Sequence, residues 1–227
     1  MIDEDETYVY EIMQDDKHPL DECAKLLAES FTKFNPIEAY LKTTYDQFFS
    51  YASTLINDAL NDETLSIVVR HKGTHQIQGV LLARDLYLQQ HHSSTTDAHF
   101  NPIIDLLGEL EDHFVKEYER VHGTKLTEKS VVSLSLEATH SDCFGRGIAT
   151  KLPKLLITHA RQMGFKNLIV ETTHPATKHI YINKLNGREL TSINPAKWLW
   201  KRGGNDKYPF GNYMTQPNEV SLIVIDL

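Results

Sequence analysis

The residues of this sequence best suited to chemistry form a glycine-containing turn, Phe-Gly-Arg-Gly-Ile-Ala-Thr, at positions 144–150. A stretch of alternating, branched residues precedes it at 131–136 and an amphipathic stretch follows it as far as Gly164, so the turn joins a predicted strand to a predicted helix. Gly145 and Gly147 permit a tight bend and a close approach of the backbone to a ligand. The free N–H groups of the first helical turn and the helix dipole favour an anion, typically phosphate. The turn therefore predicts a site for a phosphorylated ligand.

Three classes of phosphorylated ligand compete for this turn. A nucleotide-binding P-loop requires Lys and then Ser or Thr after its last glycine, whereas Ile148 and Ala149 stand here. A dinucleotide fingerprint requires Gly or Ala where Thr150 stands, and it normally follows the first strand of an alternating array. At least three predicted strands precede this turn. The pyrophosphate arm of coenzyme A is the class that remains.

The composition is that of a globular chain with an acidic balance. Of 227 residues, 41% are apolar and 24% charged, and 31 acidic against 23 basic residues give a formal net charge of -8. This balance argues against a nucleic-acid partner and favours cationic substrates. The start is acidic, and no apolar run approaches the roughly 18 residues of a membrane span, so we expect a cytoplasmic protein with no membrane partner. Cys23 and Cys143 are expected to be reduced thiols.

Hydrophobic periodicity predicts a meander of strands followed by alternating helices and strands. The predicted strands cover residues 7–13, 65–70, 77–86, 131–136, 168–170 and 220–227, and the predicted helices cover 20–36, 37–60, 102–118, 148–164 and 174–185. The second and third strands form a predicted hairpin. No repeat or linker interrupts the pattern, so we predict one mixed α/β domain over residues 1–227.

Two other groups of residues have less specific interpretations. His91, His92 and His99 lie in a polar stretch at 89–99 that is rich in Ser and Thr, and their spacing does not define a tetrahedral metal site, so we expect a solvated loop and no metal. A later loop punctuated by Gly and Pro contains Trp198, Trp200, Tyr208, Phe210 and Tyr213. These aromatic residues either wall an acceptor pocket or pack against the core.

At this point the sequence resembles a family. The run from Phe144 to Ala149 is similar to the Gln/Arg-x-x-Gly-x-Gly/Ala signature of the GNAT acetyltransferases. The strand around Leu134-Ser135-Leu136, the helix end at Gly164-Phe165 and Lys184-Leu185 match the same family. Within it, the order of elements is most like the arylalkylamine and dopamine N-acetyltransferases. Three features carry that likeness: the early segment at 31–36, the helix inserted at 102–118, and Thr172-Thr173-His174 after a strand.

The resemblance implies a splayed, mixed β-sheet flanked by helices that holds acetyl-CoA. It implies direct transfer of the acetyl group to a primary amine, most simply a small arylalkylamine or polyamine, with no metal. The strand backbone would pair with the pantetheine arm and the turn would bind the pyrophosphate. The cofactor-binding residues implied in this way are Leu134, Leu136, Phe144, Gly145, Arg146, Gly147, Ile148, Ala149 and Thr150. The oligomeric state stays open.

The catalytic residues follow from the resemblance less directly. Several GNAT enzymes place an acidic base at the end of the signature strand, where Glu137 stands, and a tyrosine acid near the position of Tyr181. The arylalkylamine group instead has a glutamate before the proline of the early segment, but that residue is Asn35 here, so Glu38, Glu137 or a water relay takes the proton. His174 is a candidate proton shuttle.

Two departures from the family pattern, Asn35 and Phe144, keep other functions open. Phe144 replaces the usual Gln or Arg, which removes one side-chain contact to the pyrophosphate, although Arg146 offers charge nearby. The alternatives to a small-amine enzyme are an acetyltransferase for protein lysines or N-termini, and a catalytically silent CoA-binding module. We predict Glu137, Tyr181 and His174 as the catalytic residues.

Overall fold

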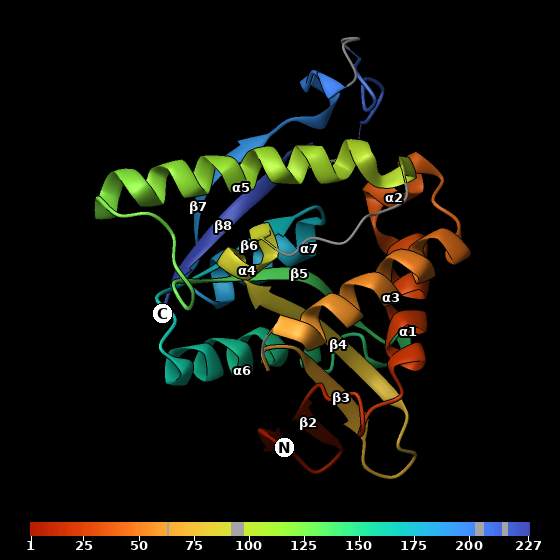
Figure 1. Ribbon diagram of the computed structural model, residues 1–227. Coiled ribbons are helices and arrows are strands. Elements are labelled where there is room, and N and C mark those ends of the chain that lie inside the picture. Colours follow the sequence, from red (N-terminus) through yellow and green to blue (C-terminus); the bar gives the residue numbers. More distant parts are fainter. Residues whose placement is uncertain (63, 92–97, 203–206, 215–217) are drawn as a thin grey trace.

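The computed structural model describes residues 1–227 apart from residues 63, 92–97, 203–206 and 215–217 (Figure 1). One eight-stranded sheet has the order β1-β2-β3-β4-β5-β6-β8-β7. Its strands are β1 Asp3–Glu4, β2 Tyr8–Ile12, β3 Ile67–His71, β4 Ile77–Asp85, β5 Val131–Thr139, β6 Asn167–Thr172, β7 Arg188–Ile193 and β8 Val220–Asp226. All neighbouring strands are antiparallel except β5 and β6, which are parallel.

Helices cover both faces of this sheet (Figure 1). Their bounds are α1 Leu20–Phe34, α2 Pro36–Leu41, α3 Tyr45–Asp62, α4 Leu86–His91, α5 Asn101–His122, α6 Ile148–Met163 and α7 Pro175–His179, followed by a π-helical turn, η3, at Ile180–Lys184. Residues of α1 to α5 form one core cluster against the sheet, whereas α6 and η3 contribute to a second cluster on the other face. No helix in the described part of the chain has the length and apolarity needed to span a bilayer.

The sheet opens between β5 and β6. These strands pair from Val131 and Asn167 to Leu134 and Val170 and then no further, although both strands continue. The register of β4 and β5 also shifts here, because Leu82 faces Leu136 while the next residue of β4 faces Leu134. The extra residue on β5 is a β-bulge, which bends a strand and raises its twist. The predicted splayed α/β sheet is thus present, and its opening lies directly before the glycine turn.

Several predicted boundaries are wrong. The helix predicted over 37–60 is broken, because Lys42 adopts a left-handed backbone conformation (φ 57°) that ends α2 before α3 begins. The strand predicted over 131–136 extends to Thr139. Strand β7 has no counterpart in the prediction, since its sequence, Arg-Glu-Leu-Thr-Ser-Ile, has little apolar content.

The polar stretch at 89–99 is only partly a loop. Its first residues, Gln89 to His91, belong to α4, and His99 lies in a short 3-10 turn, whereas residues 92–97, including His92, lie outside the described residues. The predicted hairpin is confirmed as the antiparallel pair β3 and β4.

Candidate functional site

A cavity of about 440 Å³ occupies the opening of the sheet. Its walls come from α1, α2, α3 and α5 on one face, from β5 and β6, and from α6, α7 and η3 on the other. The residues with polar or aromatic side chains in this wall are Ser30, Phe31, Phe34, Asn35, Glu38, Phe48, Tyr51, Phe100, Ser135, Glu137, Thr139, Phe144, Glu171, Thr173, His174 and Thr177. Among the described residues that line it, none is Lys or Arg.

The glycine turn forms one end of this cavity, where Phe144 and Ala149 reach the wall. Gly145 and Gly147 have positive φ values of 76° and 82°, and no atom lies within 4 Å of the place that a Cβ would occupy on either. Gly147 directly precedes α6. The N–H groups of Gly145, Gly147, Ile148 and Ala149 donate to no described partner. Four free donors at a helix N-terminus, with open space above them, fit the pyrophosphate of coenzyme A.

The edge of β5 that faces the opening also offers free backbone groups. From Ser135 to Thr139 this strand pairs only with β4, so its other side has no strand partner among the described residues. Extended backbone with unpaired N–H and C=O groups can add an extended ligand as a further strand does. The amide groups of a pantetheine arm have that form. Leu134 and Leu136 lie on this strand and line the cavity.

The side chains of the turn point to other partners. The Phe144 ring packs edge-on against Phe34 with centroids 5.4 Å apart, and the two rings are 53% and 47% exposed. The Arg146 guanidinium donates to the Tyr8 hydroxyl at 3.3 Å. Behind the turn, the buried Cys143 thiol donates to Gln78 at 2.6 Å. These side-chain contacts hold the turn in place, while the N–H groups at 145 and 147–149 have no described partner.

The half-buried Glu137 and the buried Tyr181 form a pair beside the opening. The Tyr181 hydroxyl donates to Glu137 Oε2 at 2.8 Å, and Glu137 Oε1 is shielded from solvent with no hydrogen-bond partner among the described residues. Burial raises the pKa of Glu137 to about 8, although the Tyr181 bond opposes this shift. Burial and the Glu137 charge hold the Tyr181 pKa well above its usual range. Glu137 lines the cavity, whereas Tyr181 packs in the core beneath α6.

The backbone behind Tyr181 is closely packed. The N–H of Gly187 donates to the Tyr181 carbonyl oxygen at 2.9 Å. A Cβ at position 187 would lie 2.6 Å from Cγ2 of Ile223 and 2.8 Å from that same carbonyl oxygen. Only a residue without a side chain fits there without displacing its neighbours.

His174 and Asn35 make hydrogen bonds at the edge of the cavity, near the end of β6. His174 Nδ1 accepts the N–H of Ala176 at 3.1 Å and so caps α7, while burial lowers the pKa of this imidazole. Asn35 Nδ2 donates to Thr173 Oγ1 at 2.8 Å, which ties the end of α1 to the end of β6. Asn35 Oδ1 also accepts the N–H groups of the first turn of α2. Asn35 therefore has a structural role at the position where the arylalkylamine group has a glutamate.

Glu38, on α2, also lines the cavity. Its Oε2 accepts the Thr43 hydroxyl at 2.5 Å, and that hydroxyl lies 3.0 Å from His99 Nε2. The break between α2 and α3 is what turns Thr43 back toward Glu38. Burial raises the pKa of Glu38. Both candidate bases, Glu38 and Glu137, thus line one cavity.

Glu171 is a third carboxyl in this wall, and the sequence analysis does not single it out. It lies on β6, and its Oε1 is shielded from solvent without a partner among the described residues. Burial and the nearby charge of Glu111 raise the pKa of Glu171 well above its usual value. Glu111, on α5, accepts the Gln89 side-chain amide at 2.8 Å. Its own pKa is raised to about 7 by burial.

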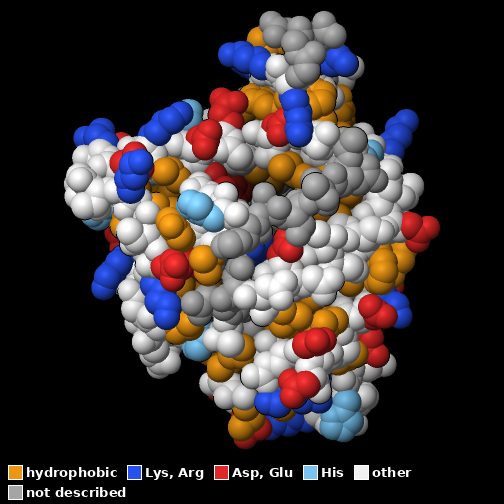
Figure 2. Space-filling model, viewed as in Figure 1, with side chains coloured by type: hydrophobic (Ala, Val, Ile, Leu, Met, Phe, Trp, Pro, Cys, Tyr) orange, Lys and Arg blue, Asp and Glu red, His pale blue; other side chains and the backbone are white. Residues whose placement is uncertain are grey.

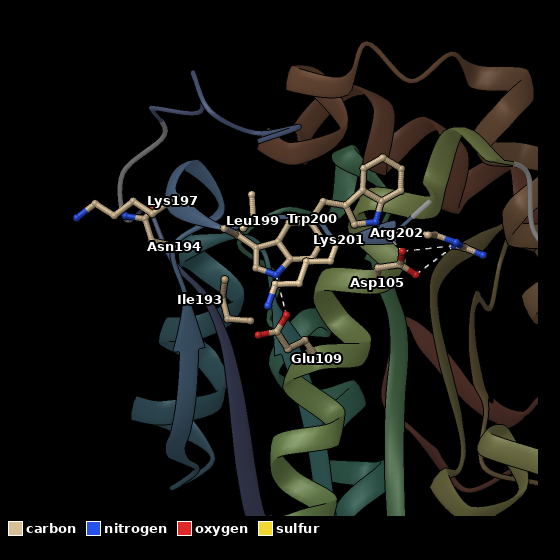
Figure 3. Close-up of a pocket in the computed structure, with 10 residues that line it drawn as sticks. Asp105, Glu109, Ile193, Asn194, Lys197, Leu199, Trp200, Lys201 and Arg202 are labelled. Carbon is tan, nitrogen blue, oxygen red and sulfur yellow. Dashed lines mark hydrogen bonds and ion pairs between the residues drawn. The ribbon is translucent and has the colours of Figure 1, made fainter. Parts of the chain in front are cut away.

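The aromatic loop lies elsewhere. Its two indoles donate to carboxylates on α5, Trp198 to Glu109 at 2.8 Å and Trp200 to Asp105 at 2.7 Å, in an open groove between α5 and residues 193–202 (Figure 3). Phe210 and Tyr213 are buried and pack against the ring of Tyr40, and Tyr208 is exposed. None of the five aromatic residues lines the central cavity. Acidic side chains gather along α5 on the face shown in Figure 2.

Solved structures with this architecture are known. The C-terminal condensation domain of Ebony, in complex with β-alanyl-dopamine, has a TM-score of 0.77 at 15% identity, over 97% of this chain and 99% of that one. Arylalkylamine N-acetyltransferase 2 from Aedes aegypti has a TM-score of 0.72 at 16% identity, over 96% and 98%. The polyamine N-acetyltransferase of Drosophila melanogaster has a TM-score of 0.65 at 14% identity, over 97% and 100%. No family model matches the sequence, and no curated protein matches it.

These similarities establish the fold. The chain has the fold of the GNAT acetyltransferases, as the glycine turn and the order of elements predict, and its structural neighbours include the N-acetyltransferases of arylalkylamines and of polyamines. At 13–16% identity they do not transfer a substrate.

Four residues in or behind the cavity wall escape the sequence analysis. Tyr51 and Glu171 line the cavity, whereas Thr43 bonds to Glu38 and Glu111 acts on Glu171 from behind the wall. Two of them carry a signal in the sequence. Glu111 comes four residues after Leu107 and three before Phe114, so it falls on the apolar stripe of α5. Glu171 continues the apolar run of β6. A charged residue on an apolar stripe or at the end of a buried strand is buried more often than its type suggests.

Proposed function

We propose that this protein is an N-acetyltransferase that uses acetyl-CoA to acetylate the primary amine of a small molecule. The observation that carries the proposal is the cavity in the opening of the sheet. It ends at the glycine turn with its free backbone donors, and a half-buried acid, Glu137, lines it from the open edge of β5. Acetyl-CoA, when bound, would supply the activated acetyl group. The unpaired N–H groups at 145 and 147–149 would hold its pyrophosphate, and β5 from Ser135 to Thr139 would hold its pantetheine arm.

Glu137 is the proposed general base. An ammonium group must lose a proton before its nitrogen attacks a carbonyl, and a base works best when its pKa lies near the working pH. A carboxyl with a pKa of about 8 is well matched to that task. The substrate nitrogen gives up two protons over one turnover: one is released to solvent through Glu137, and the other, lost after the nitrogen attacks, ends on the leaving thiolate, so the protons balance. Tyr181 is a positioning residue in this scheme, because its hydroxyl holds Glu137 Oε2.

Glu38 is the alternative base. It faces the same cavity, and its link through Thr43 to His99 offers a proton path away from the site. His174 is a proposed proton shuttle of lesser weight, because one of its ring nitrogens already caps α7. The two glutamates are separable by substitution, since only one of them bonds to Tyr181.

A small amine fits the cavity better than a protein side chain. A cavity of about 440 Å³ holds a compact ligand, and apolar side chains from α1, α3 and α5 line it together with the acids. The neighbours support the same class, because they include enzymes named for arylalkylamines and polyamines and a domain solved with an N-acylated arylalkylamine.

The test is thiol release from acetyl-CoA with a panel of arylalkylamines, diamines, polyamines and short lysine peptides. Turnover with small amines supports the proposal, and turnover with peptides alone assigns a protein acetyltransferase instead. CoA binding by calorimetry without turnover of any amine identifies a silent CoA-binding module and overturns the enzyme proposal.

A further inference from the structure

The central cavity has acidic residues without matching basic ones. Glu38, Glu137 and Glu171 line it, and no Lys or Arg does so among the described residues. A carboxylate enclosed away from water is unfavourable unless it is protonated or paired with a cation. Since the described wall supplies no cation, a cationic ligand is the natural counterpart.

Glu171 is the carboxyl that the proposed transfer leaves without a role. Two residues before it on β6, Ile169 packs in the core beneath α1 to α5, so strand alternation places Glu171 on that face of the sheet. Tyr181, the partner of Glu137, packs in the core on the opposite face. The two acids therefore approach the cavity from different sides of the sheet.

The Oε1 atom of Glu171 is an independent sign of a ligand. It is shielded from solvent and has no hydrogen-bond partner among the described residues, and it belongs to a residue that lines the cavity. Buried polar atoms are nearly always hydrogen-bonded in folded proteins, so an orphan oxygen in a cavity wall marks the place where a ligand donor binds.

Glu111 strengthens the negative potential behind this oxygen. Its carboxylate is held from α4 by the Gln89 amide, and its charge acts on Glu171. Gln89 holds Glu111 without neutralising it, because an amide carries no charge. Two acids close enough to repel each other form a stronger site for a cation than either acid alone.

Resting on the proposed function, we propose that Glu171 forms a second-cation subsite. In this subsite Glu171 binds an ammonium or guanidinium group at the far end of the acceptor, while the other amine reacts beside Glu137. The preferred acceptor is then a diamine or a related dication rather than a monoamine.

The test compares diaminopentane with pentylamine, two probes that differ by one terminal ammonium group. We expect the wild type to prefer diaminopentane in kcat/KM. We expect Glu171→Gln to lower kcat/KM for diaminopentane by roughly 10- to 100-fold, the loss typical of a hydrogen bond to a charged group. Its kcat/KM for pentylamine should stay within about twofold. The matched control is Glu109→Gln, which removes a carboxylate of α5 that lies outside the cavity.

Other outcomes overturn the subsite. An equal loss for both amines would make Glu171 a structural residue, and no loss for either would leave it without a part in binding. If Glu171→Gln folds poorly, Glu171→Asp keeps the charge on a shorter arm, and we expect its loss to be confined to the diamine.

Calorimetry with diaminopentane separates this inference from the proposed function. If the wild type acetylates no amine but binds diaminopentane, and Glu171→Gln does not bind it, the subsite stands while the enzyme proposal fails. Equal binding by both proteins overturns the subsite. Equal acetylation of both amines by the wild type also overturns it and leaves the enzyme proposal intact.

Discussion

The open groove on α5 and the central cavity both contain acidic residues, but these residues differ in how completely they are hydrogen-bonded. In the groove, Asp105 and Glu109 accept the N–H groups of Trp200 and Trp198, and Arg202 pairs with Asp105. In the cavity, Glu137 and Glu171 each keep one buried oxygen without a described partner. Acids whose bonds are complete hold two segments together, whereas acids with a bond missing are available to a ligand or a proton.

The largest expected difference between the two regions is in turnover. We expect Glu137→Gln to lower kcat by about 10²- to 10⁴-fold, because it removes the proposed base while keeping the shape of the side chain. Glu109→Gln, which removes a satisfied carboxylate, should leave kcat within about twofold. Steady-state thiol release measures both. Normal turnover by Glu137→Gln would transfer the role of base to Glu38, and Glu38→Gln is the variant that tests this.

The next difference is in the pH dependence of stability. The pKa of Glu137 is raised in the folded protein to about 8 from a usual value of 4.5, so the folded state keeps a proton that the unfolded chain releases. This group therefore lowers the free energy of unfolding as the pH rises from about 4.5 to about 8. Glu137→Gln has no such titrating group. Its free energy of unfolding relative to that of the wild type should therefore increase between pH 5 and pH 8, on the order of a few kcal/mol. Urea unfolding at the two pH values measures it, and a parallel gain in Glu109→Gln would contradict the comparison.

A finer difference concerns the Tyr181 hydroxyl. Its hydrogen bond lowers the pKa of Glu137, so Tyr181→Phe should raise that pKa further. We expect the rising limb of the kcat/KM profile to move to higher pH in this variant, with the same amine used throughout. Tyr208→Phe, which alters an exposed tyrosine, serves as the control. An unmoved profile with a lower kcat would mean that Tyr181 does not act through Glu137.

The smallest expected effect lies in the groove. Trp200→Phe removes one hydrogen bond to Asp105, which keeps its pairing with Arg202, so we expect a loss of about 1 kcal/mol in the free energy of unfolding. Thermal unfolding should report the loss. The value of kcat/KM should not change, and a clear fall in it would show that the groove takes part in catalysis.

The sequence predicts the glycine turn better than the residues beside it. A strand, two glycines with positive φ and an amphipathic helix are local features, so the turn and the elements on either side of it can be predicted from the residues at 131–164. The acidic cavity is assembled from α2, α5, β5 and β6, which are far apart in the chain. Local sequence patterns do not indicate which distant segments come together, and this is why Glu171 and Thr43 are not predicted.

The broken helix at Lys42 shows the same limit at shorter range. The apolar spacing of residues 37–60 fits one helix, and only the left-handed Lys42 ends it. That break directs the Thr43 hydroxyl to Glu38. Thr43 and Thr44, two β-branched residues of modest helix propensity, are the weak signal that could have located it.

The crowding at Gly187 has a consequence for how this site tolerates mutation. A methyl group there would press on the Tyr181 carbonyl and on Ile223, and Tyr181 is the residue whose hydroxyl reaches Glu137. One carbon atom added at position 187 would therefore change the pKa of the proposed base, Glu137, although position 187 is far from the glycine turn. Natural variation at position 187 should therefore be rarer than variation at Gly108, where a Cβ would meet open space.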